Sequence, residues 1–160
     1  MPILSWRNAV HGGLVYASGD AIATALTGQF EPIRTLGMLL VGGTLYAIEI
    51  PAYFDWIDRQ FSRSNEWNSL KRALLAQAFF NPLWIARHIF FIQLFSGRWK
   101  QINWGVLAIG LDSFLYALPI ALLINYSIQN AIPLKWRFLA SSLFSAGMAI
   151  YFALSEVLFE

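Results

Sequence analysis

The sequence LKRALLAQAFFNPLWIARHIFFIQLF, residues 70–95, is long and apolar enough to cross a membrane. It nevertheless contains Gln77, an Asn-Pro pair at positions 81 and 82, and Arg87 next to His88. Polar and charged groups are costly in hydrocarbon. Either this segment does not span a membrane, or the fold shields these groups from lipid.

The composition of the whole chain agrees with a lipid environment. Of 160 residues, 58% are hydrophobic and 12% are charged, whereas soluble domains are about 45–50% apolar and about 25% charged. The length suits one domain, and we predict a single integral membrane domain over residues 1–160. The first residues have too short an apolar run for a secretory signal and do not resemble a transit peptide, so internal information would target the chain.

The predicted fold class is all-α, a polytopic membrane helix bundle with four or five transmembrane helices. Gly and Pro inside the apolar stretches are tolerated in membrane helices, so kinks are expected at Pro51, Pro82 and Pro119. Ser69 is a plausible N-cap for the third stretch. The five apolar stretches, each near the roughly 20 residues that a span requires, are 9–28, 35–56, 71–95, 102–126 and 137–158.

The distribution of basic residues predicts an orientation. With five spans, the side that holds the N-terminus has seven Lys and Arg residues and the opposite side has three, which favours a cytoplasm-like or matrix-like N-terminal side. The seven are Arg7, Arg59, Arg63, Lys71, Arg72, Lys135 and Arg137, and the three are Arg34, Arg98 and Lys100.

Several function classes are disfavoured. A net charge of +2 without a basic face argues against nucleic-acid binding. The chain has no cysteine, and His11 and His88 lack zinc-pair spacing, so we predict no metal site. No hydrolase, metalloprotease or phosphate-loop motif is present, and Asp55 and Asp58 are best explained as a solvated helix end. We expect no enzyme, no catalytic residue and no cofactor.

Five ionisable residues fall within the apolar stretches: Asp20, Glu49, Arg87, His88 and Asp112; Glu156 lies near the end of the last stretch. A charge at the bilayer centre costs at least about 2.5–3.5 kcal/mol, so these groups should face the bundle interior, water or each other. Two interpretations stay open. Arg87 pairs with an acid of another helix and locks the bundle, or the same groups line a path for solutes. For Gln77 and Asn125 we expect hydrogen bonds between helices.

Five short sequences are in the order and nearly at the spacing of a known family. The chain resembles the family that joins the 22-kDa peroxisomal membrane protein and the Mpv-seventeen protein of the mitochondrial inner membrane, from about residue 15 to 155. The sequences are SGDAIATAL, RTLGMLLVGG, YFDWIDR, LKRALLAQAFFNP and IPLKWRF.

The positions that match the family's motifs are Gly19, Asp20, Arg34, Asp58, Arg59, Lys71, Gln77, Pro82, Pro133 and Arg137. The chain departs from the family at Ala76, which replaces an Asp, and at Ala47 and Ile48, which replace a Gly-Pro pair. The family's signature W-P-x-x-Q-x-x-N-F reads here as Ala121, Leu122, Asn125, Ile128 and Gln129.

The resemblance implies an organellar membrane protein that forms or modulates a poorly selective channel for small solutes, in the mitochondrial inner membrane or, second, the peroxisomal membrane. The alternative is a non-catalytic accessory subunit of a larger membrane complex, such as a respiratory-chain assembly. Expected partners are the lipid bilayer, other membrane subunits or a homo-oligomer, and bound phospholipid.

Overall fold

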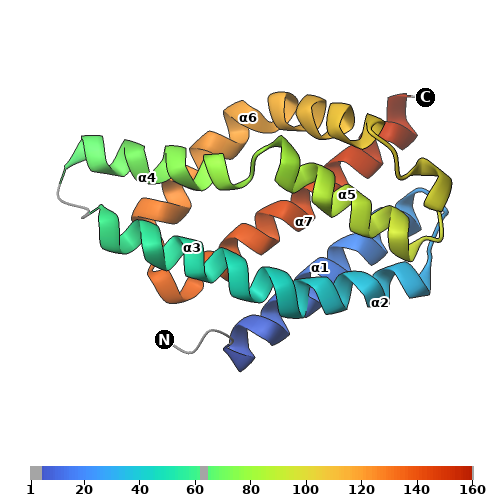
Figure 1. Ribbon diagram of the computed structural model, residues 1–160, viewed down its shortest axis with the longest axis horizontal. Coiled ribbons are helices and arrows are strands. Elements are labelled where there is room, and N and C mark those ends of the chain that lie inside the picture. The colour runs from blue at the N-terminus through green and yellow to red at the C-terminus, as the bar shows by residue number, and fades with distance from the viewer. Residues whose placement is uncertain (1–4, 62–64, 160) are drawn as a thin grey trace. The chain divides into compact units, whose positions relative to one another are not determined.

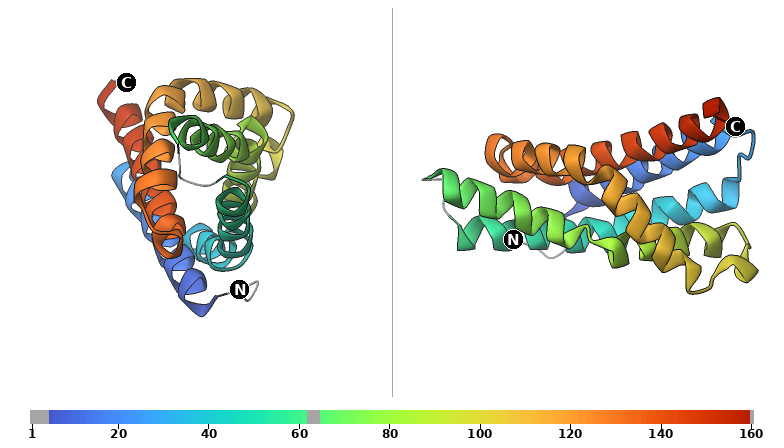
Figure 2. Two further views of the ribbon diagram at one scale, coloured as in Figure 1. Left: turned by 90° about the vertical axis from the view of Figure 1, so that its left-hand side faces the viewer. Right: turned by 90° about the horizontal axis from the view of Figure 1, so that it is seen from above.

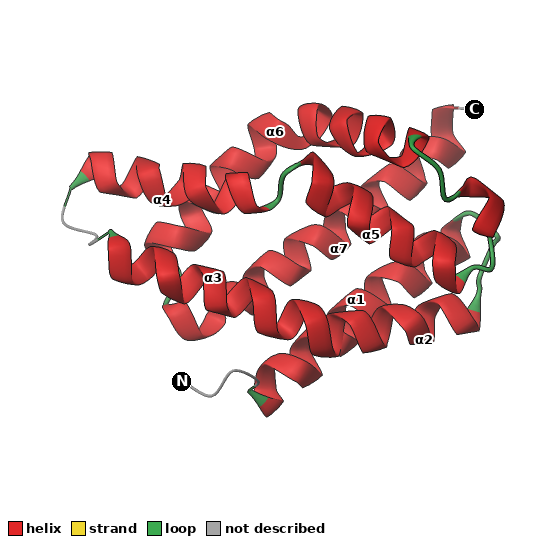
Figure 3. Ribbon diagram, viewed as in Figure 1, coloured by secondary structure: helices red, strands yellow, loops and turns green. Residues whose placement is uncertain are grey.

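The computed structural model describes residues 5–61 and 65–159, and residues 152–159 by their backbone only. In this part of the chain every regular element is a helix (Figure 3), so the predicted all-α class is confirmed. The helices form two compact units, Met1–Ala52 with Phe138–Glu160, and Tyr53–Arg137. The single domain predicted from the sequence stays a prediction.

The first unit begins with α1, Trp6–Leu26, and α2, Pro32–Val41, which lie side by side (Figure 1). Gly28 lies just after the end of α1 with φ of +67°, a left-handed conformation that glycine adopts without steric cost. Pro32 occupies the first turn of α2, where its missing N–H leaves no bond unmade. The tight turn between Gly28 and Pro32 brings α2 back along α1.

After α2 the helix widens into a π-helical turn, η1, Gly42–Tyr46, and continues as α3, Ala47–Gln60. At this turn the backbones of the two helices come very close. A Cβ added to Gly42 would lie 2.6 Å from the Gly12 carbonyl oxygen and 2.9 Å from the Tyr16 Cβ. The glycine pair of VGG, residues 41–43, therefore marks a close helix crossing.

The last element of the first unit is α7, Leu134–Phe159, which runs alongside α1 in the right-hand view of Figure 2. Gly19 lets the two helices approach, because a Cβ there would lie 2.7 Å from the Cβ of Ala146. The first residues of α7, up to Arg137, belong to the second unit.

In the second unit the stretch 71–95 is not one helix. It contains most of α4, Glu66–Phe79, and all of α5, Pro82–Phe95. Asn81 ends the interruption as an N-cap whose side-chain oxygen accepts a hydrogen bond from the Trp84 N–H at 3.0 Å. Pro82 is the first residue of α5, so it starts a helix instead of kinking one. The single third span predicted from the sequence is therefore replaced by two helices of 14 residues each.

The expected N-cap at Ser69 is also wrong, because α4 begins earlier. Asn65 caps it, and its side-chain oxygen accepts a hydrogen bond from the Asn68 N–H at 2.7 Å. Asn is among the best N-cap residues, since its short side chain reaches the free N–H groups of the first turn. Ser69 lies inside the helix and donates its hydroxyl to the Asn65 carbonyl.

The second unit is completed by a short 3₁₀ turn, η2, Trp99–Gln101, and by α6, Gly105–Ala131. Both α4 and α5 pack against α6 (Figure 1). Gly110 permits the close approach of α5, because a Cβ there would lie 2.6 Å from the Pro82 carbonyl oxygen. Pro51 and Pro119 lie within α3 and α6, and the kinks expected at them stay predictions.

Two helices of the described residues are long and apolar enough to cross a membrane. They are Pro32–Gln60, with 29 residues, and Gly105–Ala131, with 27 residues. Most of the second one is exposed. Since α4 and α5 have only 14 residues each, neither reaches the length of about 20 that a span needs.

Candidate functional site: a buried arginine cluster

Two arginine side chains of the second unit are completely buried. Arg72 on α4 and Arg137 on α7 each have an exposed fraction of 0%. They meet Asp58 near the end of α3 and Gln129 in the last turn of α6. We call Asp58, Arg72, Gln129 and Arg137 the arginine cluster. It gathers residues from four helices at one point.

Arg72 binds three oxygens. Its Nη2 lies 2.5 Å from Asp58 Oδ1 and donates to the Gln129 carbonyl at 2.9 Å, while Nη1 donates to the Phe61 carbonyl at 2.5 Å. Phe61 directly follows α3, and Gln129 belongs to the last turn of α6. The guanidinium therefore joins the C-terminal ends of two helices, where carbonyl groups have no partner within the helix.

Arg137 binds the same carboxylate oxygen. Its Nη1 lies 3.0 Å from Asp58 Oδ1 and 3.3 Å from Gln129 Oε1, and its Nε donates to the Ile132 carbonyl at 2.9 Å. Ile132 is the C-cap of α6. A single carboxylate oxygen is thus shared by two guanidinium groups.

The cluster carries two positive charges and one negative charge. Helix C-termini have an effective charge of about −0.5, so the ends of α3 and α6 offset part of the surplus positive charge. Of the three charged side chains in the cluster, Asp58 alone is partly exposed, at 32%. This geometry suits a clamp that fixes helix ends in place.

Other basic residues surround the cluster at this end of the second unit. Lys71 lies over the rings of Phe61 and Trp67, at 5.7 and 5.3 Å from their centroids, and exposed Arg59 pairs with Asp55. Cations that contact aromatic rings are common at the level of lipid headgroups. Arg63, which the orientation argument also used, lies outside the described residues.

Farther along α4, Gln77 accepts a hydrogen bond from the side-chain amide of Asn125 on α6 at 2.9 Å. Both residues are buried. The expected hydrogen bond between helices is confirmed, and it links α4 to α6 inside the apolar part of the second unit.

In the first unit, Asp20 of α1 is buried and pairs with Arg34 of α2. Its Oδ1 lies 2.7 Å from Arg34 Nε, and Oδ2 accepts from the Thr35 hydroxyl at 3.1 Å. Asp20 and Arg34, both named from the family motif, therefore form one ion pair that ties α1 to α2.

The other predicted interior charges occupy different environments. Glu49, Arg87 and His88 are half-buried. Trp84 stacks on His88, with ring centroids 5.8 Å apart, and the Arg87 guanidinium lies 6.0 Å from the Trp84 ring centroid. Asp112 is exposed on α6, so of the three environments expected for it, the interior of the second unit is wrong. The side chain of Glu156 is outside the described part of the structure.

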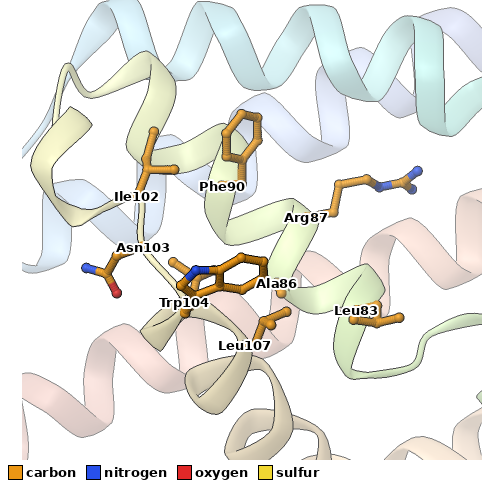
Figure 4. Close-up of a pocket in the computed structure, with 9 residues that line it drawn as sticks. Leu83, Ala86, Arg87, Phe90, Ile102, Asn103, Trp104 and Leu107 are labelled. Atoms are coloured by element: carbon orange, nitrogen blue, oxygen red, sulfur yellow. The ribbon is translucent and has the colours of Figure 1, made fainter.

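A pocket of about 250 Å³ lies between α5 and the start of α6 (Figure 4). Its walls are mainly apolar, with Leu83, Phe90, Trp104 and Leu107 as large lining groups. Arg87 contributes to the wall, and its guanidinium points away from the Phe90 and Trp104 rings in Figure 4. The chemistry of this pocket suits a hydrocarbon chain better than a polar solute.

The remaining motif positions have structural roles. Gly19 contacts α7, Pro82 begins α5, and Pro133 directly precedes α7. Arg72 is the main residue that the sequence analysis missed, since it was placed with Lys71 on the charged side of the membrane. The small residues near Arg72 on α4 could have indicated that it faces inward. Ala73, Ala76 and Gln77 share its buried face.

No protein-family model, curated protein or solved structure matches this chain. Among the described residues, no group of three or more His, Cys, Asp or Glu side chains is placed to hold a metal ion.

Proposed function

We propose that this chain is an integral membrane protein of an organelle, built on the scaffold of the Mpv-seventeen family, with four or five transmembrane helices in one domain. The positions named from the resemblance support this proposal. Asp58, Gln77 and Arg137 match family motifs, and they bind each other or the two polar residues at signature positions, Asn125 and Gln129. Its location would be the mitochondrial inner membrane or, as the second choice, the peroxisomal membrane.

Within that membrane, the geometry best supports a non-catalytic accessory subunit of a larger complex, such as a respiratory-chain assembly. The observation that carries this proposal is Asp112, whose carboxylate is exposed on an apolar helix. An ionised carboxylate that faces lipid is costly within the hydrocarbon, and a neighbouring protein would remove that cost. Four buried polar side chains bind residues of neighbouring helices, as expected for a scaffold: Asp20, Gln77, Arg72 and Arg137.

Native electrophoresis tests the subunit proposal. When native membranes are solubilised in a mild detergent, we expect the chain to migrate in a complex much heavier than 18.1 kDa that contains other proteins. Migration only as a monomer or a small homo-oligomer would rule the proposal out. A second run after alkaline extraction of the membranes excludes soluble proteins that only adhere to them. The heavy complex should stay in the membrane fraction during this extraction.

A channel for small solutes is the second candidate. It is supported by the half-buried positions of Arg87 and His88 on α5, which would line or gate a path. The purified protein should then conduct in planar bilayers, and Arg87→Leu should change its conductance or ion selectivity because it removes a fixed charge from the path. The control is Leu83→Ala, an exposed position on the same helix. A conductance that neither Arg87→Leu nor Asp20→Asn alters would exclude this role for the charges.

A further inference from the structure

One side of α6 presents a regular row of side chains. Ile109, Asp112, Tyr116, Ile120 and Leu123 are all exposed, and we call them the α6 outer face. Their spacings of three, four, four and three residues place them along one side of a helix. This is the spacing with which one helix packs against another.

The α6 outer face points away from the rest of the second unit. Gly110, which contacts Pro82 and Ala86 of α5, precedes Asp112 by two residues, or about 200° around the helix. The buried residues Ala121, Asn125 and Ile128 also belong to the inner side. Within the described residues, Asp112 has neither a hydrogen-bond nor an ion-pair partner.

Asp112 lies at a depth where water is scarce if α6 spans a membrane. At about 1.5 Å per residue, the 27 residues of α6 extend roughly 40 Å, about 10 Å more than the hydrocarbon core. With the helix centred, about three residues project at each end. Asp112 is the eighth residue of α6 and would lie about 6 Å or more inside the hydrocarbon. Its short side chain reaches the headgroups less well than that of Lys or Arg.

We propose that the α6 outer face binds a transmembrane helix of another protein, and that this helix carries a Lys or Arg that pairs with Asp112. The inference rests on the proposed function as a membrane subunit. The charge of Asp112 selects the partner, because a cation at the same depth removes the cost of an isolated carboxylate. The apolar side chains on either side supply the packing surface, and Tyr116, 82% exposed, is its largest member.

A second copy of this chain fits the face less well. A symmetric contact through α6 would bring one Asp112 to the other, and like charges repel. Other cations of the described residues lie near helix ends, as Arg59 and Lys135 do, or are half or fully buried, as Arg87 and Arg72 are. Within the described residues, a copy therefore offers no exposed cation in the middle of a helix.

A synthetic helix tests the charge requirement directly. The full chain is placed in phosphatidylcholine nanodiscs with a Leu/Ala transmembrane peptide that has a single Lys at the depth of Asp112, and association is measured by energy transfer between fluorophores. We expect the Lys peptide to bind about 5- to 30-fold more tightly than the same peptide with Leu, as for polar contacts between model helices. Asp112→Asn should abolish this preference. Leu123→Ala, the control on the same face, should weaken both peptides and keep the preference.

Equal binding of the two peptides by the wild type would overturn the inference, as would a Lys preference that Asp112→Asn retains. A second copy is tested with Tyr116→Cys, which gives the chain a single thiol because it contains no cysteine. Efficient disulfide dimers between copies in the native membrane would also overturn it.

Native electrophoresis separates this inference from the proposed function. Loss of the heavy complex with Asp112→Asn, but not with Leu111→Ala, supports the inference. If the wild type and Asp112→Asn enter the complex equally, the chain is a subunit and the inference about Asp112 fails. If the wild type enters no complex, the subunit function itself fails.

Discussion

Asp58→Asn is expected to lower the free energy of unfolding by about 3–5 kcal/mol, the usual result of removing one partner from buried charges. The change leaves Arg72 and Arg137, both fully buried, without the one carboxylate that they share. Their bonds to backbone carbonyls remain, but these carry partial charges only. Denaturant unfolding in detergent micelles, followed by the helical circular dichroism signal, measures the difference.

The matched control for this change is Asp55→Asn. Asp55 lies one turn earlier on α3, and its ion pair is with the exposed Arg59, so its loss should cost less than about 1 kcal/mol. Equal losses for the two variants would show that the arginine cluster does not stabilise the helix ends. A second variant, Arg72→Lys, changes the cation and leaves Asp58 in place. Lys keeps the positive charge, but its ammonium group cannot bind the three oxygens in the fixed geometry of the guanidinium.

The helical class and the helix positions could be predicted from the composition and from the length of the apolar stretches, because both reflect which residues are removed from water. The break in residues 70–95 could not be predicted in this way. Apolarity continues through Phe80, Asn81 and Pro82, and a proline inside a membrane helix more often gives a kink. Here the Asn81 side chain caps a new helix, and this local hydrogen bond outweighs the continuous apolar pattern.

The pairing of the interior charges could not be predicted either, because it depends on how the turns place the helices and not on the positions of the charges in the sequence. An ion pair between Arg87 and an acid of another helix was one of two interpretations, yet Asp20, one of the interior acids, pairs with Arg34 at the start of α2. The short turn after α1 brings these residues together, although they are fourteen positions apart. Exposure of Asp112 could not be predicted, since the apolar residues of α6 surround the whole helix and do not mark an inner side.

The departures from the family signature acquire a physical meaning in the structure. Ala121, Asn125, Ile128 and Gln129, which stand at signature positions, are all buried. Asn125 binds Gln77, and Gln129 binds both arginines of the arginine cluster. Small and polar side chains at these positions then serve contacts between helices.

Gly42→Leu is expected to cost more than about 3 kcal/mol, at the upper end of the effects of overpacking. Even a Cβ at Gly42 would lie 2.6 Å from the Gly12 carbonyl oxygen, so α1 and the π-helical turn must separate. The Gly12 backbone opposite cannot yield as a flexible side chain would, and Gly12 itself has no room for a Cβ against the Gly42 carbonyl. The loss should appear as a lower unfolding midpoint in detergent and as faster proteolysis near Gly28.

A glycine of the same unit with open surroundings separates this steric effect from helix propensity. Gly147 on α7 has no atom within 4 Å of an added Cβ, so Gly147→Ala should be neutral or stabilise by up to about 1 kcal/mol. Gly42→Ala has the same propensity change but should destabilise the protein, because its Cβ meets backbone on the facing helix. If Gly42→Ala and Gly147→Ala shift the midpoint by the same amount, the close approach of α1 to the π-helical turn does not hold the first unit together. If Gly42→Ala lowers the unfolding midpoint and Gly147→Ala raises it, the close contact between Gly12 and Gly42 is the reason that a glycine is required at position 42.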